Sequence, residues 1–294
     1  MNDLLAKLIP SRLRKSSTVI PVVRLTGAIM SGGSPLRPAL NLASCAGLLE
    51  KAFSYKSAPA VGIVVNSPGG SPVQSRLIYQ RIRDLAVEHE KKVHVFVEDA
   101  AASGGYMIAC AGDDITVDPS SIVGSIGVVS SSFGFVDAID KLGVTRRVYT
   151  AGQNKSVLDP FLPEKDTDIT RLKELQLEIH KVFIDLVKES RGDRLADDDD
   201  LFTGLFWAGR RGKELGLVDA IGDLRGMLKE KYGKETKLRL IERRQGLFGR
   251  RSAFGLDAGA LQFQDDLVGK AAASATDTAI TTLEEKALWA RIGL

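Results

Sequence analysis

The sequence predicts an α/β protein built on a parallel β-sheet, and three observations carry this prediction. Short apolar or β-branched runs alternate with helical patterns between residues 18 and 111. Two small-residue turns, at residues 66–71 and 99–105, each follow one of these runs directly. The crossovers of an α/β layer bring the carboxyl ends of parallel strands to one edge of the sheet. We therefore expect both turns at that edge, where α/β proteins collect their sites.

The elements of the first half follow in chain order. Residues 18–25 predict a strand, and Pro21 predicts that it lies at an edge or contains a bulge. Residues 39–54 carry apolar side chains at helical spacing, with Asn41 near the start. Residues 60–65 are almost continuously apolar, which is typical of a strand covered on both faces. The alternation continues with a helix, a strand and a short helix at residues 76–90, 93–97 and 106–111.

The second half predicts fewer strands and one long helix. Further strands are expected at residues 114–117, 126–131 and 146–150. An apolar stripe over residues 166–189 predicts the helix, and residues 205–223 predict a short helix between glycine-bounded turns. The composition changes beyond Tyr232. We expect a main domain over residues 18–232 and an extension over residues 233–294 that is helical in its last part.

Composition excludes several classes of function. A chain of 294 residues with 44% hydrophobic content can bury a sizeable core. Its formal net charge of +3, with acidic and basic residues interleaved, gives no electrostatic case for nucleic-acid binding. Cys45 and Cys110 lie in apolar helical patterns, which favours buried free thiols in a reducing compartment over a disulfide or a metal site.

The first 17 residues predict an amphipathic lead-in. Leu4, Leu5, Leu8 and Ile9 lie on one side of a helix, with basic residues around them. This segment is too short, and too interrupted by Pro10, for a cleavable secretory signal. No stretch approaches the ~20 apolar residues that a membrane-spanning helix needs. We expect a cytoplasmic protein, with peripheral contact at the inner membrane face as the minority alternative.

Ser103 lies at the second small-residue turn, between a buried strand and the start of a helix. A hydroxyl there is held rigidly near the positive end of the helix dipole, beside free backbone N–H groups. Gly104 and Gly105 let other backbone approach closely. Nucleophilic enzymes place a serine in such a position. The alternative is that Ser103 only caps the helix.

A serine nucleophile needs a base that takes its proton and donors that hold the oxyanion. The three histidines, His89, His94 and His180, lie in helix or strand patterns, which favours structural roles and disfavours a Ser-His-Asp triad. Lysine can serve instead if a desolvated pocket keeps it neutral. Lys155 follows a glycine turn and precedes a proline-bounded apolar segment, so it is a candidate base. The alternative is that Lys155 is an ordinary solvated loop lysine.

Five motifs stand in one order along the chain: NSPGGS at 66–71, AASGGYMIA at 101–109, GSIGVVS at 124–130, AGQNKS at 151–156 and FWAGRRGKELGLVDAIG at 206–222. In combination they resemble the signal peptide peptidase A family of Ser-Lys peptidases, in its short single-repeat form. The resemblance covers residues 19–226. It implies that Ser103 is the nucleophile, that Lys155 is the general base, and that Ser125 orients the lysine.

The resemblance also implies the remaining parts of the site. The backbone N–H of Gly104 is one implied oxyanion donor, and the second comes from Gly69 or Gly70, between which the sequence does not decide. The implied fold is of the crotonase and Clp-protease kind, with stacked sheet layers, surrounding helices, and a ring-like homo-oligomer. In longer, two-repeat members the serine and lysine come from different repeats, so we expect Lys155 to reach Ser103 of a neighbouring subunit. No cofactor or metal is implied.

These features predict a serine endopeptidase that cleaves unfolded, mainly apolar peptides, such as signal-peptide remnants, through an acyl-enzyme. Many family members carry a transmembrane anchor where this chain has only its amphipathic start. One alternative is acyl-coenzyme A chemistry, which the crotonase fold also hosts and for which Glu98 and Asp99 are the nearest acids. A second is a non-catalytic scaffold at a membrane, against which Ser103 and Lys155 argue.

Overall fold

The structure, a computed structural model, describes residues 17–32, 39–152, 154–242, 282–283 and 285–294. Nearly all of the predicted lead-in and most of the predicted extension lie outside these residues. No helix among the described residues is long and apolar enough to cross a membrane.

One eight-stranded sheet forms the centre of the molecule. Its main path runs in the order β6 (Phe206–Ala208), β5 (Ile122–Gly124), β3 (Lys92–Ala102), β2 (Ala60–Ser67), β1 (Val19–Thr26) and β8 (Lys237–Leu240). Strands β4 (Asp114–Val117) and β7 (Ala220–Ile221) branch off beside β3. All pairs are parallel except β5 with β6. The fold is therefore α/β, as the alternating pattern predicts.

The sheet forks along β3. Residues 94–97 of β3 pair with β4, whereas residues 100–102 pair with β5. The register between β2 and β3 shifts between Val65 and Ser67, because Val65 pairs with Val97 and Ser67 pairs with Ala101. The extra residues of β3 at this irregularity change the direction of the strand before its last three residues. Such bulges are frequent next to active sites.

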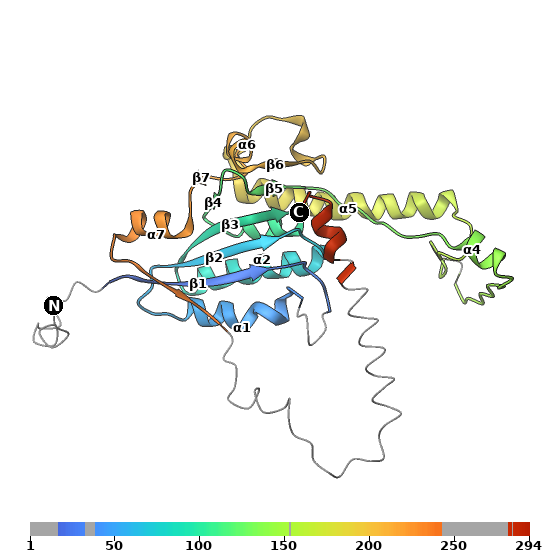
Figure 1. The fold of residues 1–294 in the computed structure, drawn as a ribbon, viewed down its shortest axis with the longest axis horizontal. Helices are drawn as coiled ribbons and strands as arrows, with labels where there is room; N and C mark the ends of the chain where they lie inside the picture. The colour runs from blue at the N-terminus through green and yellow to red at the C-terminus, as the bar shows by residue number, and fades with distance from the viewer. Residues whose placement is uncertain (1–16, 33–38, 153, 243–281, 284) are drawn as a thin grey trace, which may run out of the picture.

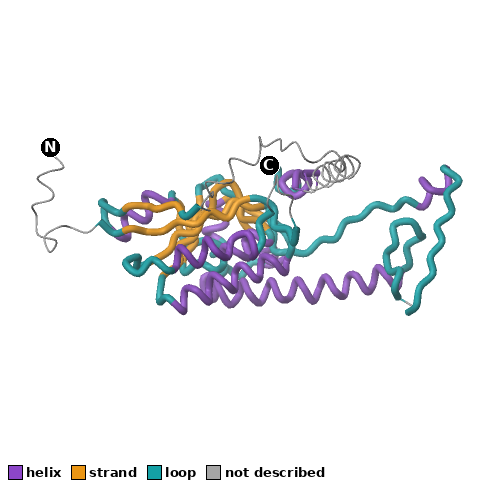
Figure 2. Tube along the Cα trace, turned by 90° about the horizontal axis from the view of Figure 1, so that it is seen from below, coloured by secondary structure: helices purple, strands orange, loops and turns teal. Residues whose placement is uncertain are grey.

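Helices cover the two faces of the sheet unequally. On one face the main core packs under α1 (Leu42–Phe53), α2 (Pro72–Glu88), α3 (Gly104–Ala109) and α5 (Asp166–Arg191). A smaller cluster on the other face packs under α7 (Leu224–Tyr232). Val23 and Leu25 face the main core while Ile20 and Val22 face α7, which is the alternation that a strand imposes. Figure 2 shows most helices below the strands in one layer.

Residues 127–165, hereafter the arm, leave this body. The arm contains α4 (Val136–Lys141), and Figures 1 and 2 show it reaching out to the far end of α5. None of its described residues is buried. Several large apolar side chains are instead exposed to solvent: Val129, Phe133, Leu142, Val144 and Tyr149. The arm has no buried core, and contacts within it join its segments, among them the stacking of Phe135 on Phe161 and the ion pair of Arg146 with Asp159.

Two strand predictions are wrong, and both fall in or beside the arm. Residues 126–131 and 146–150 form no strand, while β5 lies just upstream at Ile122–Gly124. These segments have left the sheet, so their β-branched side chains have no strand to pair with. The prediction for Pro21 is also wrong, because β1 lies between β2 and β8. Pairing with β2 begins only at Val22, so β2 does not require the N–H that Pro21 lacks.

The domain boundaries stay predictions, but part of the predicted extension belongs to the sheet. Strand β8 lies beyond residue 232 and pairs with β1. Residues 285–290 are helical, and we call residues 285–294 the end segment. Figure 1 shows it in red beside the end of β3, and Figure 2 shows it against the same end of the sheet. Ile292 and Trp289 pack there against Ala100 and Ala102 of β3.

Candidate active site

Ser103 joins the end of β3 to the start of α3, half-buried and in an unusual backbone conformation. Its φ is 53° and its ψ is −123°, a region that residues other than glycine rarely adopt. The side chain makes no capping hydrogen bond to the helix, so the interpretation of Ser103 as a mere cap is wrong. Its N–H donates to the carbonyl of Gly124 at 2.8 Å, and its carbonyl accepts from Tyr106 and Met107. The backbone is thus fixed on both sides while the hydroxyl is left uncommitted.

The turn after β2 lies directly against Ser103, which confirms that the two small-residue turns meet at one edge. A Cβ on Gly69 would lie 2.7 Å from the Cβ of Ser103 and 2.8 Å from the N of Gly104. Gly69 also has a φ of +98°, which disfavours any side chain. Glycine at this position is required both by the backbone and by the approach of the two turns.

The two glycines of this turn differ in what their N–H groups do. The N–H of Gly69 donates to Ser67 Oγ at 3.2 Å, and the carbonyl of Gly69 accepts from Ile29 N at 2.8 Å. In a planar trans peptide, the next N–H points opposite to that carbonyl. The N–H of Gly70 therefore points away from Ile29, and it has no hydrogen-bond acceptor among the described residues.

Two buried serines that the sequence analysis did not single out shape this turn. Ser67 is fully buried, donates to the carbonyl of Gly27 at 2.7 Å, and accepts from Gly69 N. Ser75 donates to the carbonyl of Ser71 at 2.8 Å. A Cβ on Gly104 would overlap with Ser75 Oγ, so α2 packs directly against the start of α3. Ser67 belongs to the NSPGGS motif, but only the fold reveals its role.

Ser125 is held next to the residue that binds Ser103. Gly124 accepts the N–H of Ser103, and Ser125 follows it with a φ of 55°. The N–H of Ser125 donates to the carbonyl of Leu205 at 2.7 Å. The structure therefore brings together Ser103, Ser125, Gly104, Gly69 and Gly70 at one edge of the sheet.

Lys155 does not join them within one chain. It lies in a turn of the arm, is exposed, and donates its N–H to the carbonyl of Gly152 at 3.4 Å. Its side chain has no hydrogen bond or ion pair to any described residue. The arm leaves the body beyond Gly127, whereas Ser103 lies within the body at the end of β3 (Figure 1). The single chain thus supplies four of the five implied roles at one place and the base elsewhere.

The histidines take structural positions, as predicted. His94 lies between the Asp114 carboxylate, 2.9 Å from its Nδ1, and the Tyr232 hydroxyl, 2.7 Å from its Nε2. His89 stacks on Phe53. His180 Nε2 lies 3.0 Å from the carbonyl of Ile126. This contact links α5 to the residue that follows Ser125.

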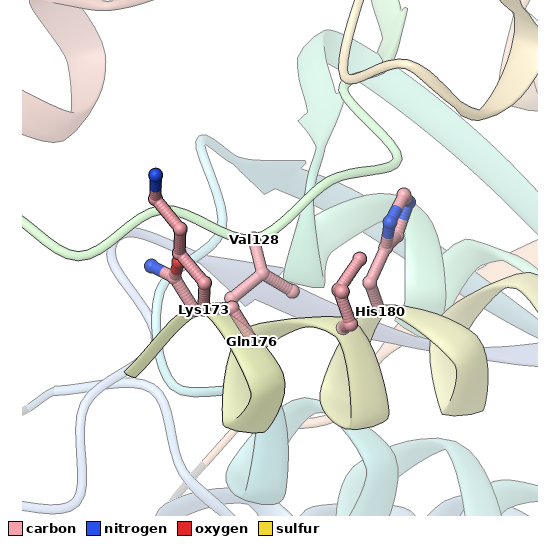
Figure 3. A pocket seen from close by; sticks show the side chains of 5 residues that line it. Val128, Lys173, Gln176 and His180 are labelled. Carbon is pink, nitrogen blue, oxygen red and sulfur yellow. The ribbon is translucent and has the colours of Figure 1, made fainter. Parts of the chain in front are cut away.

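A shallow cavity of about 250 Å³ lies between α5 and the root of the arm. Figure 3 shows three α5 side chains rising toward the chain that carries Val128: Lys173, Gln176 and His180. The lining of this cavity includes neither Ser103 nor the glycines of the two turns. This cavity therefore belongs to the attachment of the arm and not to the candidate active site.

A buried ion pair, between Arg191 and Asp219, lies next to α3. Arg191, whose side chain is fully buried, donates to both carboxylate oxygens of Asp219 at 2.8 and 2.9 Å. Burial alone would raise the pKa of the Asp219 carboxyl, but the hydrogen bonds and charge of Arg191 outweigh it and hold the pKa below its ordinary value. Tyr106 of α3 donates to the carbonyl of Leu217 at 2.7 Å. Burial raises the pKa of the neighbouring Cys110 thiol to about 12, which makes it inert.

The acids nearest to Ser103 in sequence are committed to other contacts. Glu98 pairs with Arg24 at 2.5 Å, and Asp99 accepts from Asn66 Nδ2 at 2.6 Å. Among the described residues, no group of three His, Cys, Asp or Glu side chains could hold a metal ion.

Comparisons with known proteins find a family model, related sequences and a solved structure that are similar to this chain. The family model described as Peptidase family S49 matches residues 86–238. A putative protease of Synechocystis is 30% identical over 213 residues, which is 71% of this chain and 72% of that protein. A putative protease of Methanocaldococcus jannaschii is 32% identical over 207 residues, covering 68% of this chain and 65% of that protein. A solved structure of the 1510-N membrane-bound stomatin-specific protease is 16% identical, with a TM-score of 0.47, and covers 77% of this chain and 99% of that one.

A relative from Brucella abortus has higher identity, at 62% over 292 residues, and bears the name Na(+)/H(+) antiporter NhaA. The match includes 99% of this chain but only 39% of that protein. The chain therefore spans well under half the length of this relative.

Proposed function

Because the chain belongs to peptidase family S49, we propose that it is a serine endopeptidase in which Ser103 is the nucleophile and Lys155 is the general base. The observation that carries the proposal is the backbone conformation of Ser103 together with its surroundings. Its hydroxyl makes no helix-capping bond, its backbone is held at positive φ, and the Gly69 turn lies against it. Rare backbone conformations of this kind are concentrated at active sites, where surrounding structure maintains them.

The proposed reaction assigns a chemical role to each of these residues. Neutral Lys155 takes the proton from Ser103 Oγ while that oxygen attacks the carbonyl carbon of a peptide bond. The N–H groups of Gly70 and Gly104 hold the oxyanion that forms. We assign the second donor to Gly70 because the N–H of Gly69 is already bonded to Ser67. The lysine ammonium then protonates the departing amine, and a water that Lys155 deprotonates releases the acyl group.

We propose that a second copy of the chain supplies the lysine. A lysine acts as a base only when it is neutral, which requires burial, yet Lys155 is exposed in the single chain. The same arm exposes apolar side chains, among them Phe133, Leu142 and Tyr149. Docking the arm on another subunit would bury these side chains and Lys155 together. A ring of such contacts gives every Ser103 a lysine, with Ser125 in place to orient it.

The substrates that we propose are unfolded, mainly apolar peptides such as remnants of signal peptides. Attack by Ser103 requires a peptide carbonyl that can enter the turn beside Gly70 and Gly104, and an unfolded chain presents such a carbonyl more readily than a folded protein does. The family supports a peptide substrate, and the sequence resemblance supports this particular kind.

Covalent labelling tests the proposed nucleophile. A fluorophosphonate probe should modify Ser103 of the full chain, as located by mass spectrometry, and Ser103→Ala should lose both the label and peptide cleavage. The matched control is Ser54→Ala, because Ser54 is an exposed serine at the end of α1, remote from the turn. Equal labelling or cleavage in Ser103→Ala and in the control would overturn the assignment. Saturable binding of an acyl-coenzyme A without labelling of Ser103 would favour the acyl-transfer alternative instead.

A further inference from the structure

A second cavity, of about 390 Å³, adjoins the turn that carries the proposed oxyanion donor. Gly70 and Ser71 form one side of it, next to Ile29 and Met30. Its volume lies within the range of ~300–1,000 Å³ that is usual for binding sites of small molecules. A carbonyl oxygen bound at Gly70 would place the adjoining part of a peptide at this cavity.

The end segment forms the opposite wall. Ala287, Leu288 and Arg291 line the cavity, whereas Trp289 and Ile292 of the same segment pack toward β3. Positions three and four apart share one face of a helix, so the segment has a sheet-facing side and a cavity-facing side. Ile292 is only 5% exposed, which fixes the segment on the sheet. The wall is thereby attached to Ala100 and Ala102, two of the three β3 residues that lead into Ser103.

The lining carries one kind of charge. Ile29, Met30 and Leu288 are apolar. Apart from one arginine, the polar side chains of the lining are the hydroxyls of three serines. Arg291 is the charged residue of the lining. Its guanidinium is exposed and makes no hydrogen bond or ion pair to any residue that the structure describes. A guanidinium next to an apolar floor favours a carboxylate, which it can bind through two parallel hydrogen bonds.

We propose that this cavity is a subsite for the substrate next to the scissile bond, and that Arg291 selects peptides that place a carboxylate there. The carboxylate is either a glutamate or aspartate side chain or the terminal carboxylate of a short peptide. The proposal deepens the peptidase function and rests on it. It makes residues 285–294, which lie outside the matched family segment, a determinant of specificity.

Peptide cleavage by the full chain tests this role. Two matched sets of fluorogenic peptides are compared, one with glutamate or glutamine on either side of the scissile bond, and one with a free or an amidated carboxyl terminus. The first set detects a side-chain carboxylate and the second a terminal one. Arg291→Gln should lower kcat/KM for the preferred acidic peptide about tenfold, the value of one charged hydrogen bond, and leave the neutral peptide unchanged. Arg291→Glu should reverse the preference, and Arg291→Lys should retain part of it.

The control is Lys286→Gln, which removes a cation from the exposed side of the same helix without touching the cavity. An acidic-to-neutral ratio that is the same in wild type, Arg291→Gln and Arg291→Glu would overturn the proposal while leaving the peptidase intact. If the wild type cleaves no peptide and Ser103 takes no label, the proposed function fails. Fluorescence anisotropy with the acidic peptides then decides the role of Arg291 alone, since equal binding to wild type and Arg291→Glu would contradict it.

Discussion

Ser103 combines two properties at a half-buried turn: a positive φ without glycine and a hydroxyl without a helix-capping partner. Both follow from its neighbours. The last residues of β3 are fixed by pairing with β5, and the start of α3 is pressed against Ser75 and Gly69. The surrounding contacts therefore determine the conformation of Ser103, which is how a protein maintains an unfavourable backbone at a functional residue.

Gly69→Ala tests this dependence. The added methyl group would meet Ser103 and Gly104 at under 3 Å from a backbone with φ +98°, so both turns must move apart. We expect kcat to fall about a hundredfold or more, since small displacements of catalytic groups have effects of that size. Gly47→Ala is the control, because Gly47 lies within α1 with nothing within 4 Å of the new methyl group. Full activity in Gly69→Ala would contradict the close approach of the two turns.

At the scale of elements, the sequence predicts most of the body and misplaces the arm. The helix α1, with the Asn41 capping box, and the strands β2 and β4 follow the predicted pattern closely, because each packs against a continuous core. Residues 126–131 and 146–150 have the composition of strands but lie outside the sheet. Composition reports what a segment favours when it is paired, and only the three-dimensional arrangement tells whether a partner strand is present.

The candidate site shows the same division. Its turns could be predicted because glycine and other small residues directly after an apolar strand are typical of a tight turn at the edge of a sheet. The roles of Ser67 and Ser75 could not, because each depends on a contact with a distant segment, Gly27 in one case and Gly104 in the other. The end segment was expected to be helical, but its place beside β3 carries no local signal in the sequence.

The ion pair between Arg191 of α5 and Asp219, in the loop before β7, makes the stability of the protein depend on pH. The pKa of Asp219 is lower in the folded protein than its ordinary value, so its contribution to stability is present above the unfolded pKa of about 4. That contribution is lost as the pH falls through the folded pKa. Urea unfolding between pH 7 and pH 3 should therefore show a smaller loss of free energy of unfolding in Asp219→Asn than in wild type.

Asp137→Asn, in the exposed helix α4, controls for the removal of one carboxyl group. The complementary change Arg191→Met removes the buried partner of Asp219 but leaves its ion pair with Arg194 at 3.1 Å, and we expect it to cost about 1–3 kcal/mol at neutral pH. An identical pH slope in Asp219→Asn and wild type would contradict the assigned role of this carboxylate.

For the whole molecule, the arm is the feature that a single chain does not explain. It exposes large apolar side chains, has no buried residue among those described, and carries Lys155 away from Ser103. An isolated chain gains nothing from extending such a surface into water. The second copy that we propose would cover this surface and supply the missing base in the same contact.

Mixing two inactive variants tests this central claim most directly. Ser103→Ala keeps the lysine and Lys155→Ala keeps the serine, so neither alone should cleave peptide. After subunit exchange, verified by native mass spectrometry, random mixing in a ring puts an intact serine beside a neighbour's intact lysine in about a quarter of the sites. The account predicts recovery of about a quarter of wild-type activity. No recovery in verified mixed oligomers would contradict it.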